Sequence, residues 1–201
     1  MEVYVIFSAT PNKVGKFIRI FTAEVYNHIS IALGQDLQQM YSFGRRYYHT
    51  PFWGGFVKET PSRYHVENRS AQIIICKLPV KEEQYIQLKE KLTRMEAQQD
   101  RFLYNHLSAI IYPVRWKLQV KNAYTCVEFC AQILQELGYI DGSKRFYSME
   151  DLIKTLKPYQ IYEGAMPESS QPDAEYFQPQ PLIKSLQLTA RDFLRLFARL
   201  K

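Results

Sequence analysis

The 201-residue sequence has no apolar run as long as the roughly 18 residues of a membrane-spanning helix. It also lacks a basic amino-terminal stretch of the kind that opens a secretory signal, because Met1 is followed by Glu2 and an apolar, strand-like segment. We therefore expect a soluble, cytoplasmic protein. An apolar content of 46% and a charged content of 23% exclude a disordered chain and fit one domain of roughly 150 residues plus a remainder.

Clustered positive charge is missing as well. The chain has 26 basic and 20 acidic residues, a net charge of +6, yet no run of Lys and Arg exceeds two residues. Nucleic-acid-binding surfaces usually gather such residues on one face. The spread of charge therefore predicts no nucleic-acid partner.

Cysteine is scarce, with only Cys76, Cys126 and Cys130 in the chain. Three cysteines cannot all pair, so at least one thiol is free. Cys126 and Cys130 are separated by three residues, which is not the usual zinc spacing, and too few other Cys and His residues stand at ligand spacing. We expect no metal and no cofactor.

Hydrophobic periodicity predicts a mixed α+β fold. Residues 45–69, rich in aromatics, Gly and Pro, are too long for a simple connection and predict a structured excursion; its Trp53–Phe56 segment could line a cleft or cover a sheet edge. Strands are predicted at residues 3–8, 28–33, 37–44, 71–80 and 159–164, and helices at 12–26, 80–99, 123–138 and 148–156.

The most informative local pattern is Thr125-Cys126-Val127-Glu128. Thr125 followed three residues later by Glu128 forms a capping box, which places Cys126 at the first position of a helix. The positive end of a helix favours the thiolate form of a cysteine, and the free N–H groups there can stabilise an oxyanion. The same cysteine could equally be an inert core residue.

A thiolate that transfers an acyl group needs a neighbouring imidazole, and His28 is the best candidate. His28 shares a strand face with Ser30 and Ala32, which are small enough to let a helix pack closely, while the opposite face is aliphatic. Alone, His28 could simply bond to the backbone at a strand end. Only the combination of His28 with Cys126 indicates a catalytic site.

Six segments together carry a resemblance to a known family: VYVIFS, FIRIFT, YNHISIAL, MYSFGR, PFWGGFVKE and YTCVEFCAQIL followed by IYEG. Over residues 1–164 the chain resembles the circularly permuted, NlpC-like branch of papain-fold thiol hydrolases, in which the histidine precedes the cysteine. The resemblance implies a nucleophile at Cys126 and a general base at His28, on an antiparallel sheet packed against the cysteine helix.

Relatives in that branch place a third polar residue on the strand after the histidine strand, where it orients the imidazole. No His or Glu occupies that strand here, and Gln38, Gln39 and Ser42 are the possible substitutes. The alternation of the strand puts Gln38 and Ser42 on one face and Gln39 on the other. We favour Gln38 or Ser42, and a backbone carbonyl or water in that place would leave a dyad.

The sequence thus predicts a cysteine hydrolase or acyltransferase acting on an amide, peptide or ester bond of a small peptide, amide or acyl substrate. The alternative is a non-catalytic binding module that keeps the fold, and the absence of an obvious third residue favours it.

The carboxyl-terminal part has a different composition. Residues 165–181 contain many prolines and little to bury, which predicts a linker after a domain that ends at residue 164. Residues 182–201 predict a basic amphipathic helix with an apolar stripe, comprising Leu186, Ala190, Phe193, Leu194, Phe197 and Leu200. That stripe would dock on its own domain, on a second copy of the chain, or on an anionic membrane surface.

Overall fold

The computed structural model describes residues 1–11, 22, 24–66, 68–168 and 172–200. The strands are β1 (Glu2–Ala9), β2 (His28–Ala32), β3 (Met40–Arg45), β4 (Gly54–Glu59), β5 (His65–Val66), β6 (Arg69–Ser70), β7 (Gln72–Pro79), β8 (Leu103–Tyr104), β9 (Ala123–Tyr124) and β10 (Gln160–Ala165). The helices are α2 (Glu82–Ala97), α3 (His106–Ile111), α4 (Cys126–Glu136), α5 (Met149–Leu156), α6 (Ala174–Phe177) and α7 (Leu182–Phe197), and a short 3-10 turn, η1 (Pro61–Tyr64), precedes β5.

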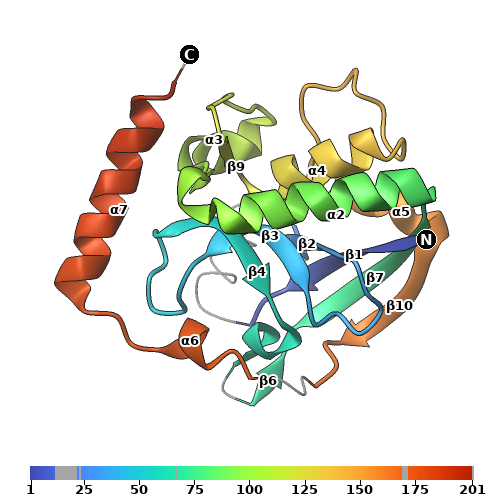
Figure 1. Ribbon diagram of the computed structural model, residues 1–201, viewed down its shortest axis with the longest axis horizontal. Helices are drawn as coiled ribbons and strands as arrows, with labels where there is room; N and C mark the ends of the chain where they lie inside the picture. Colours follow the sequence, from blue (N-terminus) through green and yellow to red (C-terminus); the bar gives the residue numbers. More distant parts are fainter. Residues whose placement is uncertain (12–21, 23, 67, 169–171, 201) are drawn as a thin grey trace.

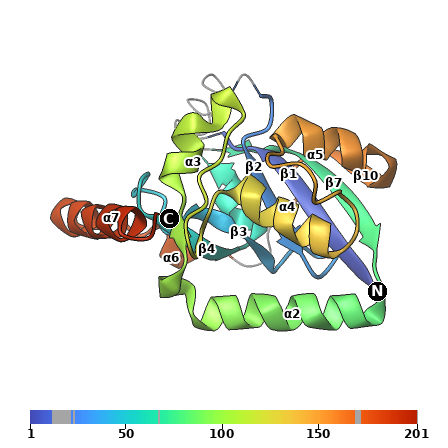
Figure 2. The same ribbon diagram turned by 90° about the horizontal axis from the view of Figure 1, so that it is seen from above.

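Eight of the strands form one sheet in the order β10-β7-β1-β2-β3-β4-β8-β9, and β5 and β6 make a separate hairpin. Neighbouring strands of the sheet run antiparallel except for β8 and β9, which are parallel. Helices α2, α4 and α5 cover one face of the sheet, while η1, the β5–β6 hairpin and α6 lie on the other side (Figures 1 and 2). The α+β class and the mainly antiparallel sheet are as predicted.

Strand β1 lies in the middle of this sheet and is buried on both faces, which explains why its sequence is a continuous apolar run. Val5 and Phe7 belong to the larger core under the helices, and Tyr4 and Ile6 belong to a second core on the other face. The sheet is therefore a central layer with hydrophobic packing on both sides.

The predicted strands and helices are mostly present, with three differences. The helix predicted at residues 12–26 lies largely outside the described residues, and residues 24–26 are not helical. The strand predicted at 37–44 begins only at Met40, and the predicted excursion at 45–69 contains a full internal strand, β4. The last two differences affect the candidate site described below.

The proline-rich segment after residue 164 is packed against the domain. Met166 is buried in the second core, and the Asp173 carboxylate pairs with the Arg63 guanidinium at 2.6 Å. Tyr176 is buried, and its ring lies 4.4 Å from the guanidinium carbon of Arg63. The described residues of this segment therefore form a strap that is packed on the domain instead of a free tether.

Helix α7 follows this strap and lies along one edge of the molecule (Figure 1). Leu196 is buried with Leu103, Val120 and Ala123. In the part of the chain that the structure describes, no helix is both long enough and apolar enough to cross a membrane.

Candidate functional site

Cys126 is the first residue of α4, as the capping box predicts. The Thr125 hydroxyl accepts the N–H of Glu128 at 3.1 Å, and the Glu128 carboxylate accepts the N–H of Thr125 at 2.7 Å. These two bonds fix the start of the helix, so the thiol sits at the positive end of the helix dipole. The residue is 5% exposed.

His28 opens β2 and meets Cys126 where helix and sheet come together. The Cys126 side chain raises the pKa of His28, so the thiol and the imidazole lie near each other. The two residues predicted to act together, 98 positions apart in sequence, are thus neighbours in the fold. The expected reason is wrong, however, since α4 packs on the aliphatic face of β2, where the Cys130 sulfur lies 3.7 Å from the carbonyl oxygen of Ile29.

The face of β2 that carries His28 and Ser30 is occupied by a carboxylate, Glu59, at the end of β4. The two Glu59 oxygens lie 3.1 and 3.0 Å from Nε2 of His28. Nε2 is thus engaged by the carboxylate, which leaves Nδ1 as the ring nitrogen for the thiol. His28 and Glu59 are thus joined by hydrogen bonds, and Cys126 lies next to the ring.

Strand β3 lies between β2 and β4, so the His28–Glu59 contact must pass over it. Gly44 of β3 makes this possible. A Cβ atom at that position would lie 3.4 Å from Oε1 of Glu59 and 3.5 Å from Cε1 of His28. Because glycine has no side chain, the imidazole and the carboxylate can meet across an intervening strand.

Glu59 is held by further hydrogen bonds on its own side. Oε2 accepts the Ser30 hydroxyl at 3.0 Å and the Tyr64 hydroxyl at 2.8 Å, and these two hydroxyls are 2.9 Å apart. A carboxylate with several donors has one fixed orientation. The network therefore holds Glu59, and through it the imidazole, in place.

The buried charges of His28 and Glu59 stabilise each other. Burial alone lowers the pKa of His28, but the Glu59 charge and hydrogen bonds with Cys126 and Glu59 raise this pKa to about 10. Burial alone raises the pKa of Glu59, but the His28 charge and hydrogen bond, with the nearby Arg63, lower it to about 2. The pair is an imidazolium and a carboxylate at neutral pH.

None of the three residues expected to orient His28 reaches its ring. The Ser42 hydroxyl donates to the carbonyl oxygen of Ile29 at 2.6 Å, which secures β3 to β2. Gln38 and Gln39 precede β3: the Gln38 amide donates to the carbonyl oxygen of Asp36 at 3.2 Å, and Gln39 accepts from Tyr41 at 3.4 Å. The side chain that contacts Nε2 of His28 is Glu59 instead.

A signal for Glu59 was present in the sequence. In Gly54–Glu59, residues 55, 57 and 59 share one face of the strand, so Glu59 aligns with a glycine and a valine on an inward face. An acidic residue at such a position needs a partner. Glu59 lies in the segment predicted as a structured excursion, one strand beyond the strand expected to carry the third residue, so it is not among the predicted site residues.

The other two cysteines are core residues. Burial raises the pKa of the Cys76 thiol to about 12 and that of Cys130 well above its ordinary value. Cys130 belongs to the core between α4 and the sheet. Cys126 is therefore the only cysteine with an imidazole partner among the described residues.

Three tyrosines lie close to Cys126 or His28 in the fold or along the sequence. Burial, and then the charges of Cys126 and Glu128, raise the pKa of Tyr104 well above its ordinary value. Tyr124 packs edge to face on Phe43, with the ring centroids 5.2 Å apart. The Tyr26 hydroxyl lies 3.4 Å from a Glu163 oxygen. Tyr124 thus packs against the core, and the Tyr26 hydroxyl is directed to β10.

The Trp53–Phe56 segment does not cover a sheet edge, because most of it belongs to β4, which lies between β3 and β8. Gly54, Gly55 and Phe56 are internal residues of β4, and Phe56 is buried in the larger core. The Trp53 indole N–H donates to a carboxylate oxygen of Asp192 at 3.1 Å. This segment therefore connects the sheet to α7.

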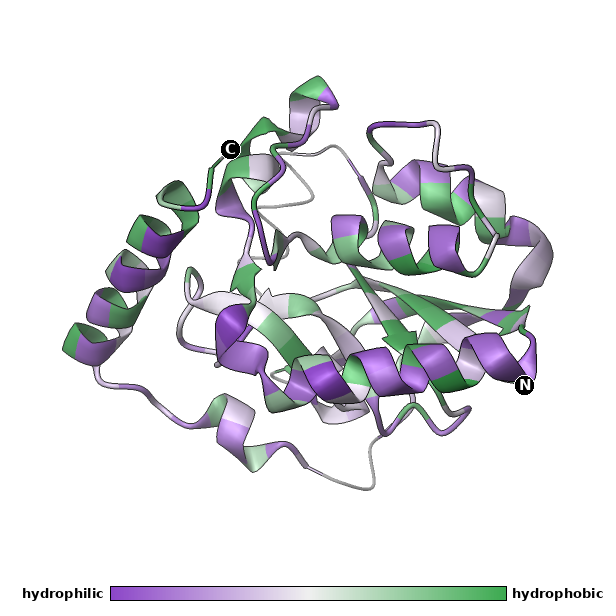
Figure 3. Cartoon of the chain, turned by 45° about the horizontal axis from the view of Figure 1, so that its top comes forward, coloured by the Kyte–Doolittle hydropathy of each residue, from purple (hydrophilic) through white to green (hydrophobic). Residues whose placement is uncertain are grey.

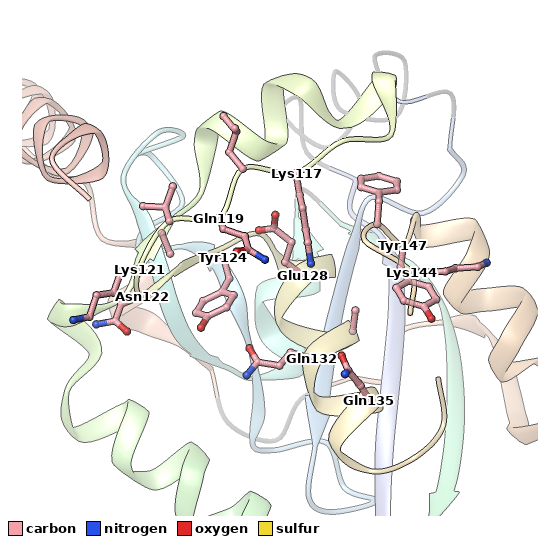
Figure 4. Close-up of a pocket in the computed structure, with 15 residues that line it drawn as sticks. Lys117, Gln119, Lys121, Asn122, Tyr124, Glu128, Gln132, Gln135, Lys144 and Tyr147 are labelled. Carbon is pink, nitrogen blue, oxygen red and sulfur yellow. The ribbon is translucent and has the colours of Figure 1, made fainter. Parts of the chain in front are cut away.

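A cavity of about 550 Å³ lies beside the outer face of α4. Its lining combines polar and apolar side chains, with Lys117, Lys121, Lys144 and Glu128 among the residues in Figure 4. Neither Cys126 nor His28 borders it. We therefore locate the candidate site by the Cys126–His28–Glu59 cluster and not by this cavity.

Among the described residues, no group of three or more His, Cys, Asp or Glu side chains is placed to hold a metal ion. Comparisons with protein-family models, with curated proteins and with solved structures find no match. The functional argument therefore depends on the geometry of the Cys126–His28–Glu59 chain.

Proposed function

We propose that the protein is a cysteine hydrolase or acyltransferase that acts on an amide, peptide or ester bond, built on a permuted papain-like fold. The observation that carries the proposal is the cluster in which Cys126 lies beside His28 and the His28 ring is hydrogen-bonded to Glu59. A nucleophile at a helix start, an imidazole beside it and a carboxylate behind the imidazole are the three roles that thiol catalysis needs.

In the proposed reaction the Cys126 thiolate attacks the carbonyl carbon of the substrate. A C–S bond forms while the carbonyl π electrons move to oxygen, and the N–H of Cys126, which has no intrahelical acceptor, is placed to stabilise that oxyanion. As the oxyanion collapses, the bond to the leaving group breaks and His28 gives the leaving group its proton. Neutral His28 then takes a proton from water or another acyl acceptor, which attacks the thioester and releases Cys126.

Glu59 acts as a positioning residue. Its carboxylate accepts the Nε2–H of His28, fixes the ring so that Nδ1 faces the thiol, and stabilises the imidazolium. Because Ser30 and Tyr64 hold the carboxylate from behind, the ring does not need to reorient during turnover. The alternative function, a non-catalytic binding module, makes no use of this charged chain.

Thiol reactivity tests the proposal. Iodoacetamide near pH 6, with the modified residue identified by mass spectrometry, should label Cys126 far ahead of Cys76 and Cys130. His28→Ala should slow the labelling of Cys126 strongly. Equal labelling of the three thiols, or a rate that is unchanged in His28→Ala, would contradict the catalytic proposal and favour the binding module.

A further inference from the structure

Helix α7 presents an apolar stripe that the rest of the chain leaves uncovered. At 100° per residue its members fall within about 120° of the helix circumference. All of them are exposed, and Leu182, Ile183 and Leu194 are more than 70% exposed. The stripe comprises Leu182, Ile183, Leu186, Ala190, Leu194 and Phe197.

A different side of the same helix attaches it to the domain. Leu196 is buried, and the Phe193 ring stacks on the His106 ring with centroids 4.8 Å apart. Asp192 accepts the Trp53 indole N–H, and Arg195 donates to the carbonyl oxygen of Asp100 at 2.7 Å. Because this side is occupied, the apolar stripe is turned away from the domain, and α7 projects from the body of the molecule (Figures 2 and 3).

The charges on α7 are of one sign wherever the helix is exposed. Its basic residues are Lys184, Arg191 and Arg195, and Arg199 follows just after its end. Its one acidic residue, Asp192, is buried and pairs with Arg191 and Arg195. On the helical wheel, Arg191 and Lys184 lie about 60° and 80° beyond Leu194, which borders the apolar stripe. Arg195 and Arg199 donate to backbone carbonyls of the domain, so the exposed surface combines large apolar side chains with the two cations Lys184 and Arg191.

We propose that α7 binds an anionic membrane surface, with the apolar stripe in the headgroup and acyl boundary and the cations against lipid phosphates. A helix of large amphipathicity with basic residues beside its apolar face has this property. The charge complementarity selects a lipid surface over a second copy of the chain, because each copy carries a net charge of +6 and brings the same cations to the contact. The inference does not depend on the catalytic proposal.

Co-sedimentation of the full chain with vesicles tests it. The protein should sediment with vesicles of phosphatidylcholine containing phosphatidylglycerol, bind pure phosphatidylcholine much more weakly, and dissociate as salt is raised. Leu186→Gln with Leu194→Gln should weaken binding at least tenfold, and Lys184→Gln should weaken it roughly fivefold. Gln is a good helix former, so the first variant keeps α7 helical, which circular dichroism checks.

Matched controls come from α2, where Ile86 is also an exposed apolar residue and Lys89 an exposed cation. Ile86→Gln and Lys89→Gln should bind vesicles like the unmodified protein. If the full chain does not sediment with anionic vesicles at low salt, the proposal is overturned. A concentration-dependent dimer that the Leu186 and Leu194 changes abolish, without vesicle binding, would overturn it in favour of a second copy. Cys126 labelling is read separately in each variant, so loss of membrane binding and loss of the thiol site remain distinguishable.

Discussion

Replacing Glu59 by Gln removes the charge from the buried pair while keeping its shape. The Gln oxygen can accept from His28, and the Gln amide can donate to the hydroxyls of Ser30 and Tyr64, either of which can accept. The substitution therefore leaves hydrogen-bonding partners for the buried polar groups. Any loss of stability reports the ion pair itself.

The expected loss follows from the geometry of the pair. Charges 3.0 Å apart attract by about 5 kcal/mol at an effective dielectric constant of about 20, and side-chain exposures of 13% and 8% for His28 and Glu59 leave little room for screening. Part of that energy offsets the cost of burial, and breaking a buried pair costs about 3–5 kcal/mol. We expect Glu59→Gln to lower the free energy of unfolding by about 3 kcal/mol at pH 6.

The loss in the free energy of unfolding should depend on pH in a specific way. The pKa of His28 rises from its ordinary 6.5 to about 10 on folding, so its contribution to stability is complete below pH 6.5 and is lost as the pH rises toward 10. The pKa of Glu59 falls from 4.5 to about 2, so its contribution is complete above pH 4.5 and is lost in acid. The difference between the unmodified protein and Glu59→Gln should therefore be largest near pH 4.5–6.5 and shrink by about 1.4 kcal/mol per pH unit above pH 6.5.

Urea unfolding at pH 6, 8 and 10 measures these differences, and iodoacetamide labelling of Cys126 in the same variant should be slowed. Glu96→Gln is the control, because the Lys58–Glu96 pair is about 40% exposed at 3.2 Å and should be worth less than about 1 kcal/mol. An equal loss for Glu59→Gln at pH 6 and at pH 10 would refute the argument, since it would mean that the proton is not held on His28.

Three further changes have defined outcomes. Thr125→Ala removes the cap of α4 and should cost about 1 kcal/mol in urea unfolding and slow Cys126 labelling, whereas Thr125→Ser should restore both. Gly44→Ala should be tolerated because its Cβ makes ordinary contacts, but Gly44→Val adds methyl groups against the buried pair and should lower both the melting temperature and the labelling rate. Removing residues 166–201 keeps all of β10 and should leave Cys126 reactive, but should lower the melting temperature because Met166 leaves the core. An unfolded product would show that the strap belongs to the domain.

Local patterns in the sequence predicted the local structure well. The Thr125–Glu128 and Ser148–Asp151 boxes start α4 and α5, and Gly138, with φ +82°, follows the end of α4 as its position suggests. Each of these depends on residues within one helical turn. These local patterns predict structure well because the interactions form within one helical turn and do not depend on tertiary packing.

The third member of the site could not be placed in the same way. Whether Glu59 reaches His28 depends on which strands are neighbours, on the register of β3 with β4, and on the missing side chain at Gly44. These features depend on residues that are far apart in the sequence. A prediction that considers only the strand adjacent to the histidine strand reaches no further than Ser42. The same holds for the strap, whose prolines predicted a free segment although Met166 and Tyr176 find places in the fold.

The order of the strands along the chain has a consequence for synthesis on the ribosome. Strands β1, β2, β3, β4 and β7 occupy adjacent places in the sheet, and all of them lie within the first 79 residues. Both charged partners, His28 and Glu59, are thus delivered early, while α4 emerges only after residue 136 is made, several seconds later at ordinary elongation rates. During that interval the sheet face of Val5 and Phe7 lacks the cover of α4 and α5, so we expect the nascent chain to engage chaperones before the thiol reaches its partner.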